Sequence, residues 1–188
     1  MNPHANRILT RLFELASAPA PRPPARSPST FELFAREVSQ ADALRLARLT
    51  VKQHRAAKAR WPDIDLTEAD LARHIIRVLP GSSSWRIDRW VAALHRDDLF
   101  LAAACLRGIP GAQRALQDEH GQILASALGR APARQRGRVT RALREHLFVG
   151  DDAHPAHLFK YRGMTSLGAW LHVASIRYVL GSLRSSGA

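Results

Sequence analysis

The chain has 188 residues, 46% of them hydrophobic, and carries 28 Lys and Arg residues against 16 Asp and Glu residues, a formal net charge of +12. This length and apolar fraction suffice for one domain of ordinary size with an extension. The excess of cations favours a polyanionic partner. No window approaches the roughly 18 uninterrupted apolar residues of a spanning helix, and no signal peptide is evident, so no membrane partner is expected. The single cysteine, Cys105, excludes an internal disulfide and suits a reducing cytoplasm.

A proline-rich stretch divides the start of the chain. Arg7 to Ala16 can form a short helix, whereas Ala18 to Pro28 holds five prolines and predicts an extended linker. Thr30 offers an N-cap for a helix from Phe31 onward. Residues 1–30 are therefore predicted to be a flexible, proline-rich segment.

A helical extension is predicted over residues 31–95. Ala41 to Arg60 is rich in Ala, Leu and Arg and predicts a long helix, which ends at Trp61-Pro62 because proline disfavours helix in the preceding residue. Thr67 begins the next helix with a capping-box-like pattern, in which Asp takes the usual Glu place. Ser84 caps a further short helix.

Residues 96–188 predict a second helical unit. Asp97-Asp98 opens its first helix, where the helix macrodipole favours carboxylates. Further helices are expected over Gly111 to Leu128 and Ala131 to Val149. The sequence shows no alternating strand pattern of useful length, no internal repeat and no heptad run. The predicted fold is all-α and multi-helical.

The last predicted helix follows a loop with an aromatic residue between two cations, Lys160-Tyr161-Arg162. Gly163 allows a tight bend, and Thr165 or Ser166 can cap the helix. Three- and four-residue spacing predicts an apolar face made of Ala169, Val173, Ile176, Leu180 and Leu183. Beside it lies a small and basic stripe made of Trp170, Ala174, Arg177, Gly181 and Arg184. Such a stripe suits a nucleic acid strand; the alternative is an ordinary amphipathic helix with solvated arginines.

The helix before that loop, Arg136 to Val149, has one apolar and one basic face. The apolar face comprises Val139, Ala142, Leu143, His146 and Leu147. The opposite face comprises Arg138, Arg141, Arg144 and Glu145, joined by Phe148. A phenylalanine among arginines has no obvious internal use, and this combination is typical of partner surfaces. A solvated basic face is the alternative.

Very little in the chain indicates catalysis. There are nine histidines but no His-Glu-x-x-His pattern, no cysteine–histidine ligand set and no glycine-rich phosphate loop. Two histidines at His154 and His157 make a poor metal site by themselves. We therefore expect no enzyme, no metal site and no cofactor.

The segment Gly163-x-x-Ser166-Leu167-x-Ala169-Trp170-Leu171, with the apolar helix that continues to Arg184, resembles conserved region 2 of bacterial RNA polymerase sigma factors. The likeness is greatest to the small extracytoplasmic-function type. It covers roughly Asp97 to Arg184 and implies a region 2-like helical bundle. Residues 31–95 resemble the helical extension found in a variant group of these factors.

The resemblance implies a transcription initiation factor. In that family one helix docks on the clamp helices of the polymerase's largest subunit, and the following loop and last helix melt and hold the promoter −10 element. By position, the implied polymerase contacts are Arg138, Arg141, Arg144 and Phe148. The implied contacts to promoter DNA are Lys160, Tyr161, Arg162, Trp170, His172, Arg177 and Arg184. The expected partners are RNA polymerase core and promoter DNA, with an anti-sigma factor as a further candidate, in the cytoplasm.

The chain departs from the family at several points. The family's polymerase-binding helix usually starts with acidic residues, whereas Arg134 to Arg138 is basic here. Arg177 stands where the family often has Asn, and Gly181 where it has Asp. The sequence ends four residues after Arg184, so we expect no second sigma domain, the helix-turn-helix that reads the −35 element.

Three interpretations stay open. The first is a sigma-like initiation factor. The second is a degenerate or truncated sigma-fold protein-interaction module, which regulates transcription without recognising promoters. The third is a helical domain that binds nucleic acid without sequence preference.

Overall fold

The computed structural model describes residues 40–78, 90, 92–150 and 155–185. Its elements in chain order are the helices α3 (Gln40–Arg60), α4 (Glu68–Val78), α6 (Arg96–Leu106), α7 (Ala112–Leu128) and α8 (Ala133–Arg144), the π-helical turn η1 (Glu145–Val149), the 3₁₀ turn η2 (His157–Lys160) and helix α9 (Leu167–Ser185). Across these ranges there is no β-strand, which confirms the predicted all-α, multi-helical fold. The predicted segment 1–30, the start of the helix expected from Phe31 and most of the helix expected from Ser84 lie outside the described residues.

Local chemistry sets the boundaries of the first two helices. Helix α3 ends where Pro62 follows Trp61, as predicted. Helix α4 begins with the predicted cap: the backbone N–H of Asp70 donates to Thr67 Oγ1 at 3.1 Å, and the Thr67 hydroxyl donates to Asp70 Oδ2 at 2.8 Å. Three large aliphatic side chains of α4, Leu71, Ile75 and Ile76, are buried against α3 and α6.

Helix α6 forms the centre of the core. Every side chain from Leu99 to Cys105 is buried, as is usual for a helix that is apolar on all sides. It packs against α3 and α4 on one side and against α7 and α9 on the other, so one continuous hydrophobic cluster joins both halves of the described chain. Burial raises the pKa of the Cys105 thiol to about 12, which fits the inert core thiol that its apolar neighbours predict.

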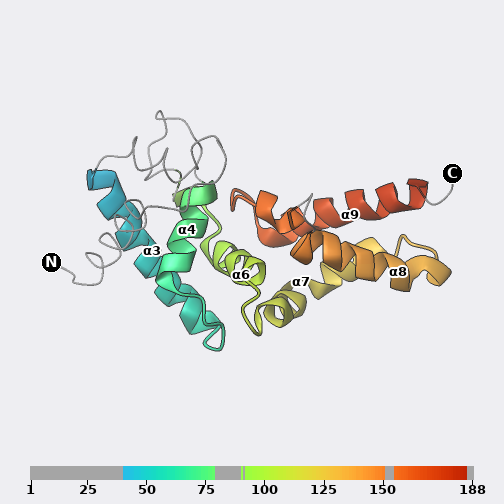
Figure 1. Cartoon of the computed structure of the whole chain (residues 1–188), viewed down its shortest axis with the longest axis horizontal. Coiled ribbons are helices and arrows are strands. Elements are labelled where there is room, and N and C mark those ends of the chain that lie inside the picture. Colours follow the sequence, from blue (N-terminus) through green and yellow to red (C-terminus); the bar gives the residue numbers. More distant parts are fainter. Residues whose placement is uncertain (1–39, 79–89, 91, 151–154, 186–188) are drawn as a thin grey trace, which may run out of the picture.

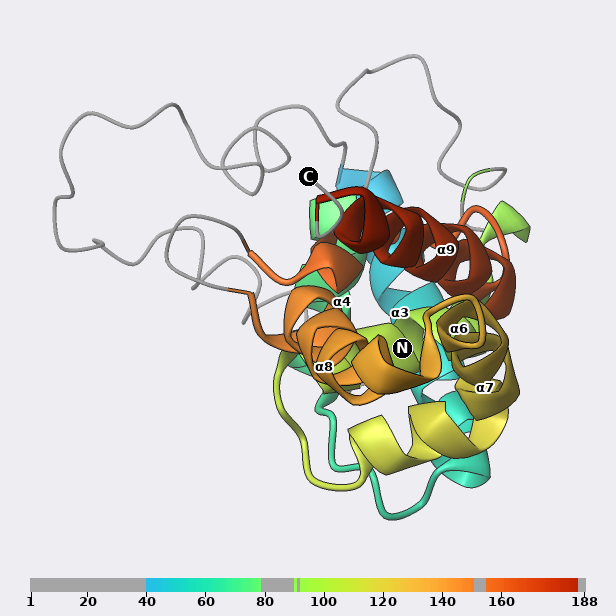
Figure 2. The same ribbon diagram turned by 90° about the vertical axis from the view of Figure 1, so that its right-hand side faces the viewer.

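The molecule is elongated along this succession of helices. Helices α3 and α4 lie at one end and α8 and α9 at the other, with α6 and α7 between them (Figure 1). Viewed along that axis, α9 lies beside α7 and above α8 (Figure 2). Arg60, the last residue of α3, crosses to the other half and donates to both carboxylate oxygens of Glu119 on α7 at 2.7 Å. The two halves are therefore joined by polar contacts as well as by the core.

Candidate functional site

Long-range contacts position the loop before α9. The carbonyl of Gly163 accepts a hydrogen bond from the backbone N–H of His95 at 2.8 Å. Gly163 has φ 73°, and a Cβ at this position would lie 2.7 Å from Leu99 Cγ. A left-handed backbone pressed against a core leucine requires glycine, so the predicted bend also brings the loop against α6.

Two side chains cap α9. The predicted cap Ser166 accepts a hydrogen bond from the backbone N–H of Ala169 at 3.2 Å, which decides between Thr165 and Ser166. The second is Asp98 of α6, whose Oδ2 accepts from the backbone N–H of Leu167 at 2.7 Å. The prediction placed Asp98 only at the start of its own helix. In the structure its carboxylate also stabilises the start of α9.

The buried face of α9 is not the predicted one. The buried residues are Leu167, Gly168, Leu171, Ala174, Ser175 and Val179. Val173 is 47% exposed and Leu180 44% exposed, so most of the predicted apolar stripe faces outward, whereas Leu183 packs partly buried against Val139 and Val179. The reason is close packing: a Cβ on Gly168 would lie 3.0 Å from Ile123 of α7. The buried face combines the aliphatic Leu167, Leu171 and Val179 with small residues, which allow α7 and α9 to approach closely.

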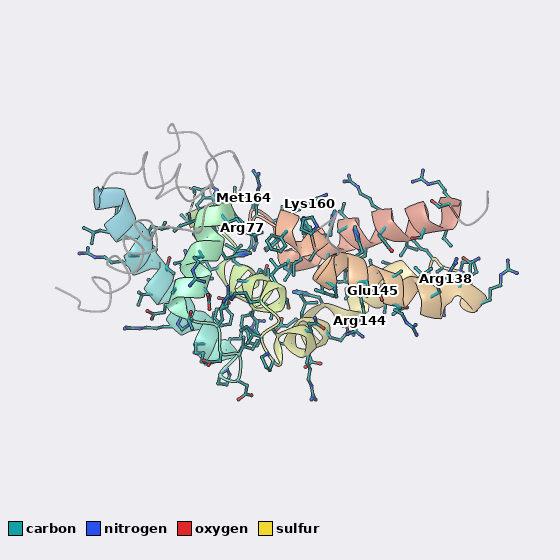
Figure 3. The ribbon with its side chains drawn as sticks, viewed as in Figure 1. Arg77, Arg138, Arg144, Glu145, Lys160 and Met164 are labelled. Carbon is teal, nitrogen blue, oxygen red and sulfur yellow. The ribbon has the colours of Figure 1, made fainter. Side chains whose placement is uncertain are left out.

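Five cationic or ionisable side chains of this region are exposed, and we call them the η2–α9 face: Lys160, Arg162, His172, Arg177 and Arg184. Lys160 is seen at the η2 turn, next to α9, in Figure 3. None of the five forms an ion pair with a carboxylate of the described chain, and α9 itself contains no Asp or Glu. Five of the seven predicted DNA contacts are thus exposed and uncompensated. Arg177 and Arg184 share one side of α9, whereas His172 lies about 140° away around the helix.

The predicted role of Tyr161 as a DNA contact is wrong, because its side chain is buried. Its side chain is 1% exposed, and its hydroxyl donates to the carbonyl of Thr165 at 2.8 Å. Burial, together with the neighbouring carboxylate of Asp98, raises the pKa of its phenol well above the usual range. The ring packs edge-on against Trp170, with centroids 5.7 Å apart. A ring enclosed in this way cannot stack on a nucleic acid base.

Phe159, which is not among the predicted DNA contacts, is the exposed ring of the same segment. It is 43% exposed, and the guanidinium of Arg77 from α4 lies over its ring, 4.1 Å from the centroid. The 3₁₀ turn turns Phe159 outward and Tyr161 inward. The sequence gives only a weak signal for this choice, because both rings lie beside a cation in Phe159-Lys160-Tyr161-Arg162.

Trp170, the seventh predicted DNA contact, is half-buried in an aromatic cluster that also comprises Tyr178, His146, His157 and Tyr161. His146 stacks between Tyr178 and His157, with centroid distances of 4.5 and 4.6 Å. His157 lies 5.5 Å from the Trp170 ring. Burial lowers the pKa of both histidines, and the charge of Lys160 lowers each further. The cluster joins η1, η2 and α9 and favours neutral imidazoles.

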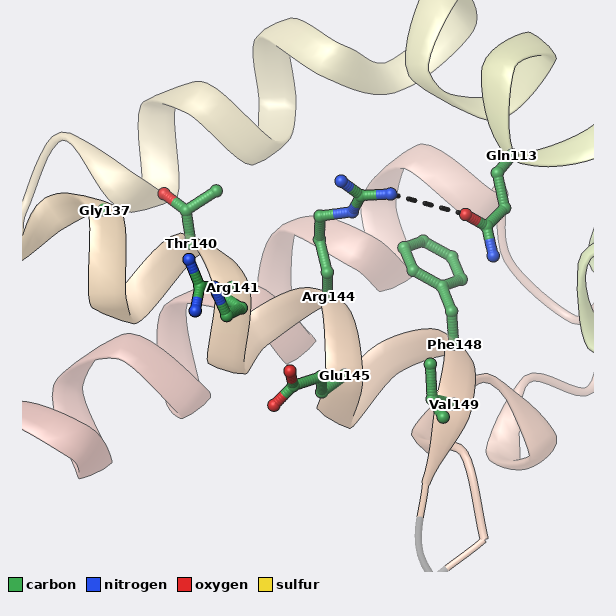
Figure 4. Close-up of a pocket in the computed structure, with 8 residues that line it drawn as sticks. All are labelled: Gln113, Gly137, Thr140, Arg141, Arg144, Glu145, Phe148 and Val149. Atoms are coloured by element: carbon green, nitrogen blue, oxygen red, sulfur yellow. Dashed lines mark hydrogen bonds between the residues drawn. The ribbon is translucent and has the colours of Figure 1, made fainter.

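A second surface is the groove along α8 and η1, a hollow of about 320 Å³ (Figure 4). The α8–η1 groove is lined by Gln113, Gly137, Thr140, Arg141, Arg144, Glu145, Phe148 and Val149. Arg144 Nη2 donates to Gln113 Oε1 of α7 at 3.5 Å. The groove brings together three of the four predicted polymerase contacts, and the fourth, Arg138, is exposed on the same helix (Figure 3).

The π-helical turn shapes this groove. The extra residue of a π turn shifts the side chains that follow it, and such turns often occur at functional sites. It leaves Val149 70% exposed and Phe148 half-buried against the main core. Phe148 therefore has an internal partner, contrary to the interpretation from sequence. Val149 is the apolar side chain of the groove that is most available to a partner.

Comparisons with models of protein families, with curated proteins and with solved structures find no match for this chain. Among the described residues, no helix has the length and apolar character needed to cross a membrane. The same residues include no group of three or more His, Cys, Asp or Glu side chains arranged to hold a metal ion.

Proposed function

We propose that this chain is a sigma-like transcription initiation factor, which binds RNA polymerase core through the α8–η1 groove and promoter −10 DNA through the η2–α9 face. The observation that carries the proposal is the η2–α9 face itself. Its cations belong to the segment that resembles sigma region 2, and they are exposed with no carboxylate partner in the described chain. Uncompensated cations gain free energy by displacing the counterions of a phosphate backbone.

The proposed contact with an unpaired base shifts from Tyr161 to Phe159. Stacking requires an accessible ring face, and Phe159 is the exposed ring beside Lys160. Arg77 over one face of that ring keeps it in place and adds a cation at the same point. In this proposal Lys160 and Arg162 hold the neighbouring phosphates, and Arg177 and Arg184 follow the backbone along α9.

The proposed polymerase contact combines charge with an apolar anchor. Arg141 and Arg144 flank one side of the groove, and Val149 projects at its end. Glu145 is the acidic residue in the lining. A partner that fits this groove presents carboxylates opposite the arginines and an apolar side chain for Val149 and the exposed part of Phe148.

The test is binding of DNA that carries a −10-like element, as a forked and as a closed duplex, to polymerase core with and without the full chain. We expect the chain to retain forked DNA on the core and to prefer it to closed duplex. Exchanging Val149 for Ser should weaken binding of the chain to the core, whereas exchanging the exposed Ala125 of α7 for Ser should not. A chain that neither binds the core nor prefers forked DNA would refute the proposal.

A second candidate function is a sigma-fold interaction module that regulates transcription without contact to a promoter. The observation that favours it is the exposed aliphatic stripe of α9, which includes Val173 and Leu180. Aliphatic side chains gain little from a phosphate backbone but suit a protein partner. Binding to the core without any gain of affinity for forked DNA would select this candidate.

A further inference from the structure

Helix α3 carries more cations than its internal contacts employ. It has six Lys and Arg residues in 21 positions and a single acidic residue, Asp42. Three of the six, Arg45, Lys58 and Arg60, make contacts within the chain. Lys58 Nζ donates to the carbonyl of Ile64 at 2.8 Å, and Arg60 pairs with Glu119 and Asp97.

Three others, Arg48, Lys52 and Arg55, form what we call the α3 cation stripe. All three side chains are exposed, and none forms an ion pair or hydrogen bond with another side chain of the described chain. Their spacing of four and three residues puts them on one side of the helix. At 1.5 Å of rise per residue the stripe spans about 10 Å, which matches about three phosphates of one DNA strand at roughly 3.4 Å each.

The surroundings of the stripe distinguish between kinds of anionic partner. No large hydrophobic side chain is exposed on the described part of α3, and its other exposed positions include Ala56 and Ala59. A helix that lies on a membrane surface needs large apolar side chains on its buried side. Protein partners likewise bind through aromatic or aliphatic anchors. Cations alone, in a row, are the pattern of phosphate contacts.

We propose that the α3 cation stripe is a second nucleic-acid contact, which holds the phosphate backbone of a double helix without reading its sequence. It lies at the end of the molecule opposite α8 and α9 (Figure 1). The stripe therefore provides duplex binding that does not depend on the η2–α9 face. It retains its role even if the chain shows no preference for forked DNA.

The test compares two triple variants of the full chain that carry the same net charge, reduced from +12 to +9. One exchanges Arg48, Lys52 and Arg55 for Gln. The matched control exchanges Arg96, Arg114 and Arg130 for Gln, which are exposed and lie outside both proposed DNA surfaces. The probes are a closed duplex of arbitrary sequence, titrated at several salt concentrations, and vesicles with anionic headgroups. A conservative variant, Arg48→Lys with Arg55→Lys, keeps the charge.

The stripe variant should bind closed duplex on the order of tenfold more weakly than the control variant near 0.1 M salt. The slope of its log binding constant against log salt concentration should be less steep by about 2 to 3, since each phosphate contact contributes about 0.9 to that slope. The conservative variant should bind like the unmodified chain. Equal losses in both triple variants would show that net charge alone acts, and would overturn the proposal. A loss confined to vesicles would assign the stripe to a membrane surface and overturn it as well. Circular dichroism of each variant checks that the helices are intact.

Discussion

The carboxylate of Asp98 on α6 accepts a hydrogen bond from the backbone N–H of Leu167 at the start of α9, across 69 positions of sequence. The same carboxylate lies beside the buried hydroxyl of Tyr161. One side chain thus connects the central helix, the loop and the helix that carries three of the five residues of the η2–α9 face.

Replacing Asp98 by Ala should therefore destabilise the fold. Loss of a capping carboxylate costs about 1–2 kcal/mol, and the buried N–H of Leu167 loses its acceptor. Urea unfolding followed by circular dichroism measures the change in free energy of unfolding. The control is Asp118→Ala on the exposed side of α7, which should change stability by less than about 0.5 kcal/mol. Equal stability of the two variants would show that this hydrogen bond contributes nothing.

Alanine substitutions at the two loop glycines, Gly108 and Gly163, distinguish the cost of backbone strain from the cost of a steric clash. Both have positive φ, at 63° and 73°, but a Cβ on Gly108 meets nothing within 4 Å, whereas one on Gly163 lies 2.7 Å from Leu99. Gly108→Ala should cost about 1–2 kcal/mol from the left-handed backbone. Gly163→Ala should cost a further 1–3 kcal/mol or so from overpacking. Thermal unfolding of both variants gives the comparison, and similar losses would argue against a tight loop–α6 contact.

Substitutions of Tyr161 should reduce the stability of the fold, whereas substitutions of Phe159 should reduce binding to forked DNA. Truncating the buried Tyr161 to Ala should cost about 3–5 kcal/mol of stability, and Tyr161→Phe, which removes only the hydroxyl, should leave DNA binding unchanged. Phe159→Ala removes an exposed ring, so it should weaken binding to forked DNA by the roughly 1–3 kcal/mol of one stacked base and leave the fold intact. Fluorescence anisotropy with forked and closed duplex measures both. Reduced binding by Tyr161→Phe with an unchanged fold would mean that the buried hydroxyl takes part after all.

His74 makes stability depend on pH. Its Nδ1 lies 2.9 Å from Arg77 Nη2, so it accepts this hydrogen bond, and its Nε2 is buried without a partner in the described chain. Burial, with a smaller effect of Arg77, lowers the pKa of His74 to about 3. The unfolded chain therefore binds a proton near pH 6.5 that the folded chain excludes, and stability falls as the pH drops from about 6.5 toward 3.

At pH 5 this difference amounts to about 2 kcal/mol of lost stability relative to pH 7. His146 and His157 act in the same direction, because their pKa values are lowered as well. The measurement is the free energy of unfolding at pH 7 and pH 5 for the unmodified chain and for His74→Gln. The variant should lose less stability than the unmodified chain between the two pH values. An identical pH dependence would show that the pKa of His74 is not lowered by folding.

Local patterns in the sequence predicted the elements well where the deciding atoms are neighbours in the chain. Four such features are the cap at Thr67, the end of α3 just before Trp61-Pro62, the start of α6 near Asp97 and the cap at Ser166, and all rest on contacts within a few residues. Such features follow from backbone hydrogen bonding and proline sterics alone.

The failures concern choices that depend on the rest of the molecule. Helix α9 has two stripes that can face a core, and the choice depends on how closely Gly168 lets α7 approach. Phe159 and Tyr161 both lie beside cations, and the ring chosen for burial, Tyr161, lies beside the carboxylate of Asp98 on α6. Asp98 serves two helices because of a contact across 69 positions. Periodicity and local motifs contain no information on these long-range contacts.

The central claim is that the cations of the η2–α9 face hold promoter DNA, and its most direct test is the affinity of the double variant Arg177→Gln with Arg184→Gln for forked DNA at two or more salt concentrations. The matched control is Arg114→Gln with Arg130→Gln, which removes the same charge from exposed positions outside this face. We predict that the first variant binds forked DNA more weakly than the control. The slope of its log binding constant against log salt concentration should be less steep by about 2, because two phosphate contacts are lost. Equal affinity and equal salt dependence of the two variants would contradict the claim.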